Sequence, residues 1–145
     1  MDGITKEREA KLTKTIKLPN KAIYQFPKCW EIYLAYVPPM EENGHQTFGI
    51  RPFLITSNNK CNKSSTEING YALSTKNPRL PVHTVINPNS NNGLMEKSIV
   101  VMEQCHTIPK RFLIKKLGKI SDIDTKKKIL RSFHRQWIDF LAVEE

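Results

Sequence analysis

Between residues 30 and 102 the chain is built from short apolar runs, which clusters of Pro, Gly and Asn separate from one another. The runs are rich in β-branched and aromatic residues, and they are shorter than an ordinary helix. The predicted strands are residues 31–37, 52–57, 68–73, 81–86 and 99–102. Many short strands with turn signals between them predict a mainly β domain, folded as a small barrel or sandwich.

The segment 49–55, Gly-Ile-Arg-Pro-Phe-Leu-Ile, places an arginine beside a buried strand. Pro52 has no N–H to donate and is best tolerated as the first residue of a strand, so we expect Arg51 at the mouth of that strand. Its planar guanidinium carries donors that fit a phosphate. An arginine next to Gly or Pro is also a common surface turn residue, and this segment alone leaves both interpretations open.

The two ends of the chain differ from its middle. Residues 1–28 contain lysines at helical spacing and predict a basic, partly helical extension, with a solvated arm of no fixed function as the alternative. Residues 29–145 are predicted to form a single domain. Near its end, Ser121 precedes two acids and predicts the N-cap of an amphipathic helix. The apolar residues expected to pack on the strands are Ile123, Leu130, Phe133, Trp137 and Leu141. Of these, the aromatic residues Phe133 and Trp137 are expected to lie in the core.

The 145-residue chain carries a net charge of +9, which favours a polyanionic partner. Nucleic acid, an anionic membrane surface and an acidic protein all fit that charge. Cys29, Cys61 and Cys105 lack the spacing of a zinc site or a disulfide scaffold, and Cys61 is predicted to lie in a loop. We find no secretory signal and no apolar run of about 20 residues, and therefore expect a cytoplasmic protein with reduced thiols.

Polar residues follow or precede several of the predicted strands, where functional sites are commonly built. His45 lies in the loop before Arg51, Ser74 and Thr75 end a strand, and Glu103 and Gln104 directly follow another. Each has an ordinary structural explanation as well: a loop histidine, a turn serine, or a glutamate that pairs with a lysine.

The order of these segments resembles that of one protein family. The chain reads IYLAYVPP…GHQTFGIRPFLI…ALSTK…LPVHTVI…GLMEKSIVVMEQCHTIPKRFLIKKLGKIS. Over about residues 28–122 this resembles the MazF/PemK (Kid-type) toxins of bacterial toxin–antitoxin systems, which show GDIYLADLxP, GxRPVLI, LPTHV and SVVLLEQIRTIDKRRL in this order. The resemblance implies an SH3-like barrel that acts as a homodimer. It also implies a sequence-selective endoribonuclease that cuts single-stranded mRNA without a metal or cofactor.

The resemblance also assigns roles to residues. The family arginine matches Arg51, its hydroxyl residue Ser74, its acid Glu103, and the histidine of the plasmid branch matches His45. Cleavage by the 2′-hydroxyl needs a base, an acid and charge stabilisation, and we expect Glu103 as base, His45 as acid or stabiliser, and Arg51 and Ser74 on the phosphate. The residues expected to contact RNA are Phe48, Thr75, Lys76, Arg79 and Gln104.

The chain departs from the family pattern at several positions. Trp30 replaces a glycine, and Cys105-His106-Thr107-Ile108-Pro109 loses an arginine and an acid. Val101 stands where the plasmid branch has an arginine, so a mechanism with that arginine as acid cannot operate here. Three alternatives therefore stay open: a nucleic-acid-binding barrel without catalysis, a gyrase-poisoning toxin of the same fold, and a toxin that has lost its activity.

The family also implies a protein partner. This is an antitoxin whose acidic, disordered C-terminal segment would cover the basic site. For the homodimer, the C-terminal helix and the late strands are the candidate interface.

Overall fold

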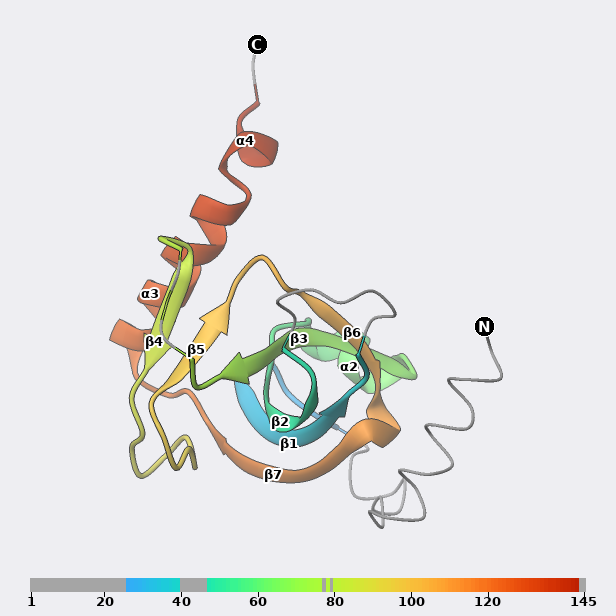
Figure 1. The fold of residues 1–145 in the computed structure, drawn as a ribbon. Helices are drawn as coiled ribbons and strands as arrows, with labels where there is room; N and C mark the ends of the chain where they lie inside the picture. Colours follow the sequence, from blue (N-terminus) through green and yellow to red (C-terminus); the bar gives the residue numbers. More distant parts are fainter. Residues whose placement is uncertain (1–25, 40–46, 77, 79, 144–145) are drawn as a thin grey trace.

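The computed structural model describes residues 26–39, 47–76, 78 and 80–143 (Figure 1). The predictions made for residues 1–25, His45 and Arg79 lie outside these residues. The strands are β1 (Glu31–Val37), β2 (Gly49–Ile55), β3 (Glu67–Ser74), β4 (His83–Ile86), β5 (Ser98–Val101), β6 (His106–Pro109) and β7 (Leu113–Lys119). The helices are α2 (Asn59–Ser64), α3 (Ile123–Gln136), α4 (Ile138–Leu141) and the short 3-10 helix η2 (Lys110–Phe112).

The described strands form one antiparallel sheet of seven strands in the order β4-β5-β3-β2-β1-β7, with β6 also paired to β3. The sheet curls strongly around its core (Figure 1). It is nevertheless open, because β4 and β7 stand at opposite ends of the strand order. The prediction of a mainly β fold with a C-terminal helix is confirmed, whereas a closed barrel is not formed by these pairings.

Alternate residues of the strands contribute to two separate apolar clusters, as strand geometry requires. Phe53 and Ala72 belong to the first cluster. Leu54 and Leu73 belong to the second. Gly70 lets β2 and β3 approach closely, since a Cβ atom at Gly70 would lie 2.0 Å from the carbonyl oxygen of Leu54. Both faces of the central strands are therefore buried, which explains their nearly continuous apolar sequences.

Several predicted boundaries are wrong. β2 begins at Gly49, so Pro52 lies inside the strand opposite Leu34. The β2–β3 pairing starts only at Phe53. Pro52 is therefore paired on one side, and its missing N–H can face the unpaired side.

Cys61 lies in helix α2 and not in a loop, because the Asn58 side chain accepts a bond from the Cys61 N–H and caps that helix.

Helix α3 contacts the sheet through a face that differs from the predicted one. Its buried residues are Ile129 and Ser132, and the Ser132 hydroxyl is hydrogen bonded to that of Thr84 on β4. The N-cap is Asp122 and not Ser121; its side chain accepts bonds from Thr125, which lower its pKa. Phe133 and Trp137 are 43% and 39% exposed, so the prediction that they lie in the core is wrong.

In the part of the chain that the structure describes, no helix is long and apolar enough to cross a membrane.

Candidate functional site around Arg51 and Glu103

Arg51 lies in β2, half-buried and opposite Ala35. Its Nε donates a hydrogen bond to the carbonyl oxygen of Phe48, at 2.7 Å. Gly49, between them, has a φ of +92°, which few other residues adopt and which lets the chain turn into the strand. This turn folds the guanidinium back over the segment that leads into β2, and no other side-chain bond of Arg51 is seen within the described residues.

Gln104 holds the same segment from another part of the fold. It lies in the turn between β5 and β6, and its Oε1 accepts a hydrogen bond from the Thr47 N–H at 2.8 Å. Thr47 is buried, and the Gln104 N–H bonds to the carbonyl oxygen of Val101 to close the turn. Because Arg51 bonds to Phe48 and Gln104 to Thr47, the start of β2 and the β5–β6 turn are held beside each other.

Ser74 is the last residue of β3. The last pair between β2 and β3 is Phe53 with Ala72, and beyond it Ser74 pairs with Ile99 of β5. Since side chains alternate along a strand, Arg51 shares a strand face with Phe53, and Ser74 shares one with Ala72. Ser74 is buried, and its hydroxyl oxygen accepts a bond from the Lys76 N–H at 3.2 Å.

Glu103, next to Gln104, pairs with a histidine that the sequence analysis did not select. The Nε2 atom of His83, the first residue of β4, lies 2.8 and 3.0 Å from the two carboxylate oxygens of Glu103. The side chain of His83 is 7% exposed and that of Glu103 is 29% exposed. Among the described residues no lysine pairs with Glu103, and the nearly buried imidazole of His83 holds its partially exposed carboxylate.

Two further groups lie close to this turn. Burial raises the pKa of the Cys105 thiol and that of the Tyr71 hydroxyl, which share a hydrogen bond, so both are neutral near pH 7. Burial also lowers the pKa of His106, and its Nε2 atom has no hydrogen-bond partner in the described part of the chain.

The residues predicted to contact RNA differ in their exposure and in the hydrogen bonds that they already form. The Phe48 ring is 49% exposed beside Arg51, and Thr75 and Lys76 are exposed where the chain leaves β3. One oxygen lone pair of Gln104 is already used by Thr47. Within the described residues, no group of three His, Cys, Asp or Glu side chains is placed to hold a metal ion.

The sequence matches the family model described as the PemK-like, MazF-like toxin of type II toxin–antitoxin systems, over residues 28–135. The chain belongs to this family. A curated relative, the endoribonuclease MazF of Staphylococcus saprophyticus, is 32% identical over 94 residues, which cover 63% of this chain and 76% of the relative.

Solved structures of the family share the fold. MazF of Deinococcus radiodurans is 15% identical with a TM-score of 0.61, and the match covers 77% of this chain and 96% of that one. An endoribonuclease in complex with its cognate antitoxin, from a mycobacterial species, is 24% identical with a TM-score of 0.55, covering 75% and 90% of the two chains.

The backbone conformation at Trp30 explains why the family has a glycine at this position. Trp30 has a φ of +74°, the left-handed region that glycine enters without strain. Its N–H bonds to the carbonyl oxygen of Ile55 at 2.8 Å, and its own carbonyl accepts from the Ile120 N–H at 2.9 Å. The ring lies against Lys126 of α3, with the ammonium nitrogen 5.4 Å from its centroid. Trp30 thus joins β1, β2 and α3 in a conformation that a tryptophan rarely adopts.

Proposed function

We propose that the protein is the toxin of a toxin–antitoxin pair and a sequence-selective, metal-independent endoribonuclease that cuts single-stranded mRNA. The observation that carries this proposal is the pair of hydrogen bonds that holds Arg51 beside the turn with Glu103 and Gln104. A cation and a carboxylate are two of the groups that cleavage by a 2′-hydroxyl requires, and Ser74 at the end of β3 would supply the hydroxyl. The family assignment and the relative named as an endoribonuclease support the same activity.

In this mechanism the 2′-oxygen of the RNA forms a bond to the adjacent phosphorus while the bond to the 5′-oxygen breaks. Glu103 takes the proton of the 2′-hydroxyl, and Arg51 and Ser74 bind the phosphoryl oxygens, whose negative charge grows in the transition state. His45 gives the proton that the 5′-oxygen needs. The products are a 2′,3′-cyclic phosphate and a 5′-hydroxyl, and Phe48, Thr75, Lys76, Arg79 and Gln104 contact the RNA on either side.

The proposed protein partner is an antitoxin with an acidic, disordered C-terminal segment. The net charge of +9 favours such a segment. Of the related solved structures, one is an endoribonuclease in complex with its cognate antitoxin, and another is the MazE–MazF complex of Deinococcus radiodurans. An antitoxin bound over Arg51 would exclude RNA from the site.

We also propose a homodimer that forms through the two C-terminal helices. We define the α3–α4 apolar stripe as the large apolar residues from the start of α3 to the end of α4 that are exposed in the single chain. The stripe consists of Ile123, Leu130, Phe133, Trp137, Ile138, Phe140 and Leu141. Patches of this kind on a soluble protein commonly mark an interface with another protein.

The activity is tested by incubating the purified protein with a long single-stranded RNA in excess EDTA, beside Arg51→Ala. We expect wild type to give fragments that end in a 2′,3′-cyclic phosphate, and Arg51→Ala to cut at least about 10²-fold more slowly. Exposed Lys60 on α2 supplies the control, since Lys60→Ala removes a charge outside β2 and outside the turn that carries Glu103. Intact RNA with wild type would contradict the proposal and favour a binder without catalysis or a gyrase-poisoning toxin.

A further inference from the structure

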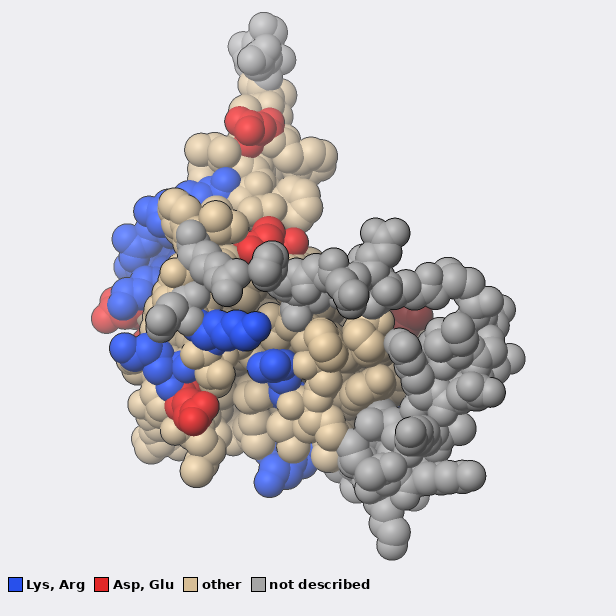
Figure 2. Space-filling model, in the orientation of Figure 1, with Lys and Arg blue, Asp and Glu red and all other residues tan. Residues whose placement is uncertain are grey.

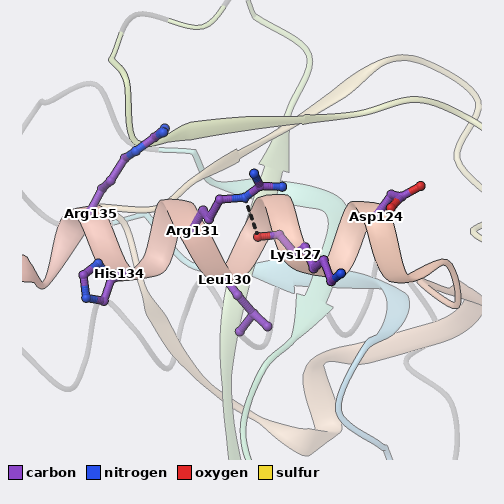
Figure 3. Close-up of a pocket in the computed structure, with 6 residues that line it drawn as sticks. All are labelled: Asp124, Lys127, Leu130, Arg131, His134 and Arg135. Carbon is purple, nitrogen blue, oxygen red and sulfur yellow. Dashed lines mark hydrogen bonds between the residues drawn. The ribbon is translucent and has the colours of Figure 1, made fainter.

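Helix α3 carries three basic side chains, Lys127, Arg131 and Arg135, each four residues after the one before it. We call these the α3 basic row. With a rise of about 1.5 Å per residue, consecutive members lie about 6 Å apart along the helix axis. In Figure 3, Arg131 and Arg135 extend to the same side of the helix, and Leu130 and His134 extend to the opposite side. The row lines an open hollow of about 730 Å³.

The hollow is also lined by one acidic residue, Asp124. Within the part of the chain that the structure describes, no carboxylate forms an ion pair with Lys127, Arg131 or Arg135. The two arginines bond instead to carbonyl oxygens, Arg131 to that of Lys127 and Arg135 to that of Pro81, both at 3.4 Å. Figure 2 shows blue side chains gathered on this side of the molecule, over α3.

One end of the row, at Arg135, is joined to the segment that precedes β4. Arg135 bonds to Pro81, which lies two residues before His83, and His83 contacts Glu103. α3 is fixed in this position because the Thr84 hydroxyl bonds to Ser132 and donates to the carbonyl oxygen of Lys128. The row therefore leads from the proposed catalytic carboxylate along the outer side of the helix.

We propose that the α3 basic row binds the phosphate backbone of the RNA strand that flanks the cleavage point; this rests on the proposed ribonuclease function. Regularly placed cations that form no ion pair with a described carboxylate suit a regularly charged chain, and guanidinium groups suit its phosphates. An acidic protein segment would also need several apolar anchors. Among the residues that line the hollow, however, Leu130 alone is apolar. The row holds the strand and lengthens the footprint of the protein on RNA, without reading the bases.

The test measures binding and not cleavage. The probes are 2′-O-methyl RNAs, whose blocked 2′-oxygen prevents cleavage, in a short form of about 6 nucleotides and a long form of about 24. The variant is Lys127→Gln with Arg131→Gln, because glutamine keeps a good helix former at both positions. Arg135 is left unchanged because it bonds to Pro81 near the site.

We expect the variant to bind the long RNA at least tenfold more weakly and the short RNA as wild type does. The dependence of log affinity on log salt should fall by about 1.4, since each phosphate contact on a single strand contributes about 0.7. The control, Lys60→Gln with Lys97→Gln, makes the same charge change at exposed positions outside α3 and should keep both affinity and slope.

Equal weakening by the variant and the control would overturn the proposal, because net charge alone would then explain the binding. Unchanged RNA binding together with lost affinity for an acidic antitoxin peptide would overturn it as well and assign the row to the protein partner. Failure of the ribonuclease proposal would be seen separately, as absence of cleavage of unmodified RNA by wild type.

Discussion

A single imidazole nitrogen of His83 lies within hydrogen-bond distance of both carboxylate oxygens of Glu103, at 2.8 and 3.0 Å. The two residues are 20 positions apart in the sequence and come from the start of β4 and the turn after β5. Because the side chain of His83 is 7% exposed, it reaches RNA less readily than Glu103 does. We therefore regard His83 as a residue that positions the proposed base.

This relationship predicts opposite outcomes for two substitutions of His83. His83→Leu removes the nitrogen that holds Glu103, and we expect kcat to fall by about 10- to 100-fold with little change in KM, since general base catalysis contributes about 10² or more. His83→Gln can place an amide nitrogen near the position of Nε2 and should retain most of the activity. Steady-state cleavage of a fluorogenic RNA measures both, and equal losses in the two variants would contradict the positioning role.

A second prediction concerns the strained backbone at Trp30. Both Trp30→Ala and Trp30→Gly lose the contact with Lys126, but only glycine relieves the left-handed conformation at φ +74°. We expect Trp30→Gly to be more stable than Trp30→Ala by about 1 kcal/mol in urea unfolding, the reverse of the usual order. Trp137, with a φ of −110°, serves as the control, where glycine should be no more stable than alanine. An alanine variant at Trp30 that equals or exceeds the glycine variant would show that the strain is absent in solution.

Local sequence patterns determined part of this fold well. The predicted strand 31–37 has the bounds of β1, since its apolar run is stopped by two prolines. Strands β6 and β7 were not predicted, because β6 is short and ends in Pro109 and β7 is rich in lysine. They form because β3 and β1 offer edges to pair with. Helix α2 contains Asn59, Cys61, Asn62 and Ser64, which have little helix propensity, and the Asn58 cap helps to stabilise it.

In the candidate site, too, some features could be predicted from the local sequence and others depend on the tertiary structure. Arg51, Ser74 and Glu103 were selected from the sequence because their residue types fit the chemistry and their order resembles that of a family. The bond between His83 and Glu103 could not be predicted, since it depends on the register of β4 against β5. The periodicity of α3 indicated an amphipathic helix but not which side faces the sheet, and the side that faces it carries Ile129 and Ser132.

A third prediction follows from half-buried His106. Burial holds its folded-state pKa below the value of 6.5 that applies in the unfolded chain, so the unfolded state takes up the proton first as the pH falls. The free energy of unfolding should therefore decrease as the pH is lowered through and below 6.5, and recover on return to pH 7.5. The neighbouring Cys105 and Tyr71 do not titrate in this range, because burial raises the pKa of both.

Thermal unfolding of two variants at pH 7.5 and 5.5 isolates this contribution. His106→Phe removes the titrating ring where it packs near Phe53, at a centroid distance of 6.4 Å, and should reduce the loss of stability at pH 5.5. His134→Asn removes an exposed histidine of α3 and should leave the loss as in wild type. A pH dependence that persists in His106→Phe and disappears in His134→Asn would reverse the assignment.

The last prediction tests the proposed homodimer. In the α3–α4 apolar stripe, the rings of Phe133 and Trp137 lie 6.4 Å apart and those of Trp137 and Phe140 lie 6.2 Å apart, so the exposed aromatic residues form a continuous row. Leu130 extends to the opposite side of α3 from Arg131 and Arg135 (Figure 3), so a dimer contact through the stripe would leave these two arginines accessible. Replacing two of the stripe residues should therefore weaken the dimer while leaving the proposed RNA contacts in place.

Leu130→Gln combined with Phe133→Gln makes this change at exposed positions, where the folded monomer loses little packing. Sedimentation over a range of concentrations should show wild type as a dimer, and the variant with a dissociation constant at least about 100-fold higher, since central interface residues contribute about 2 kcal/mol or more each. Met95, 93% exposed outside the stripe, supplies the control, and Met95→Gln should sediment as wild type does. A wild type that stays monomeric at all concentrations, or a variant that dimerises equally well, would exclude this stripe as the interface.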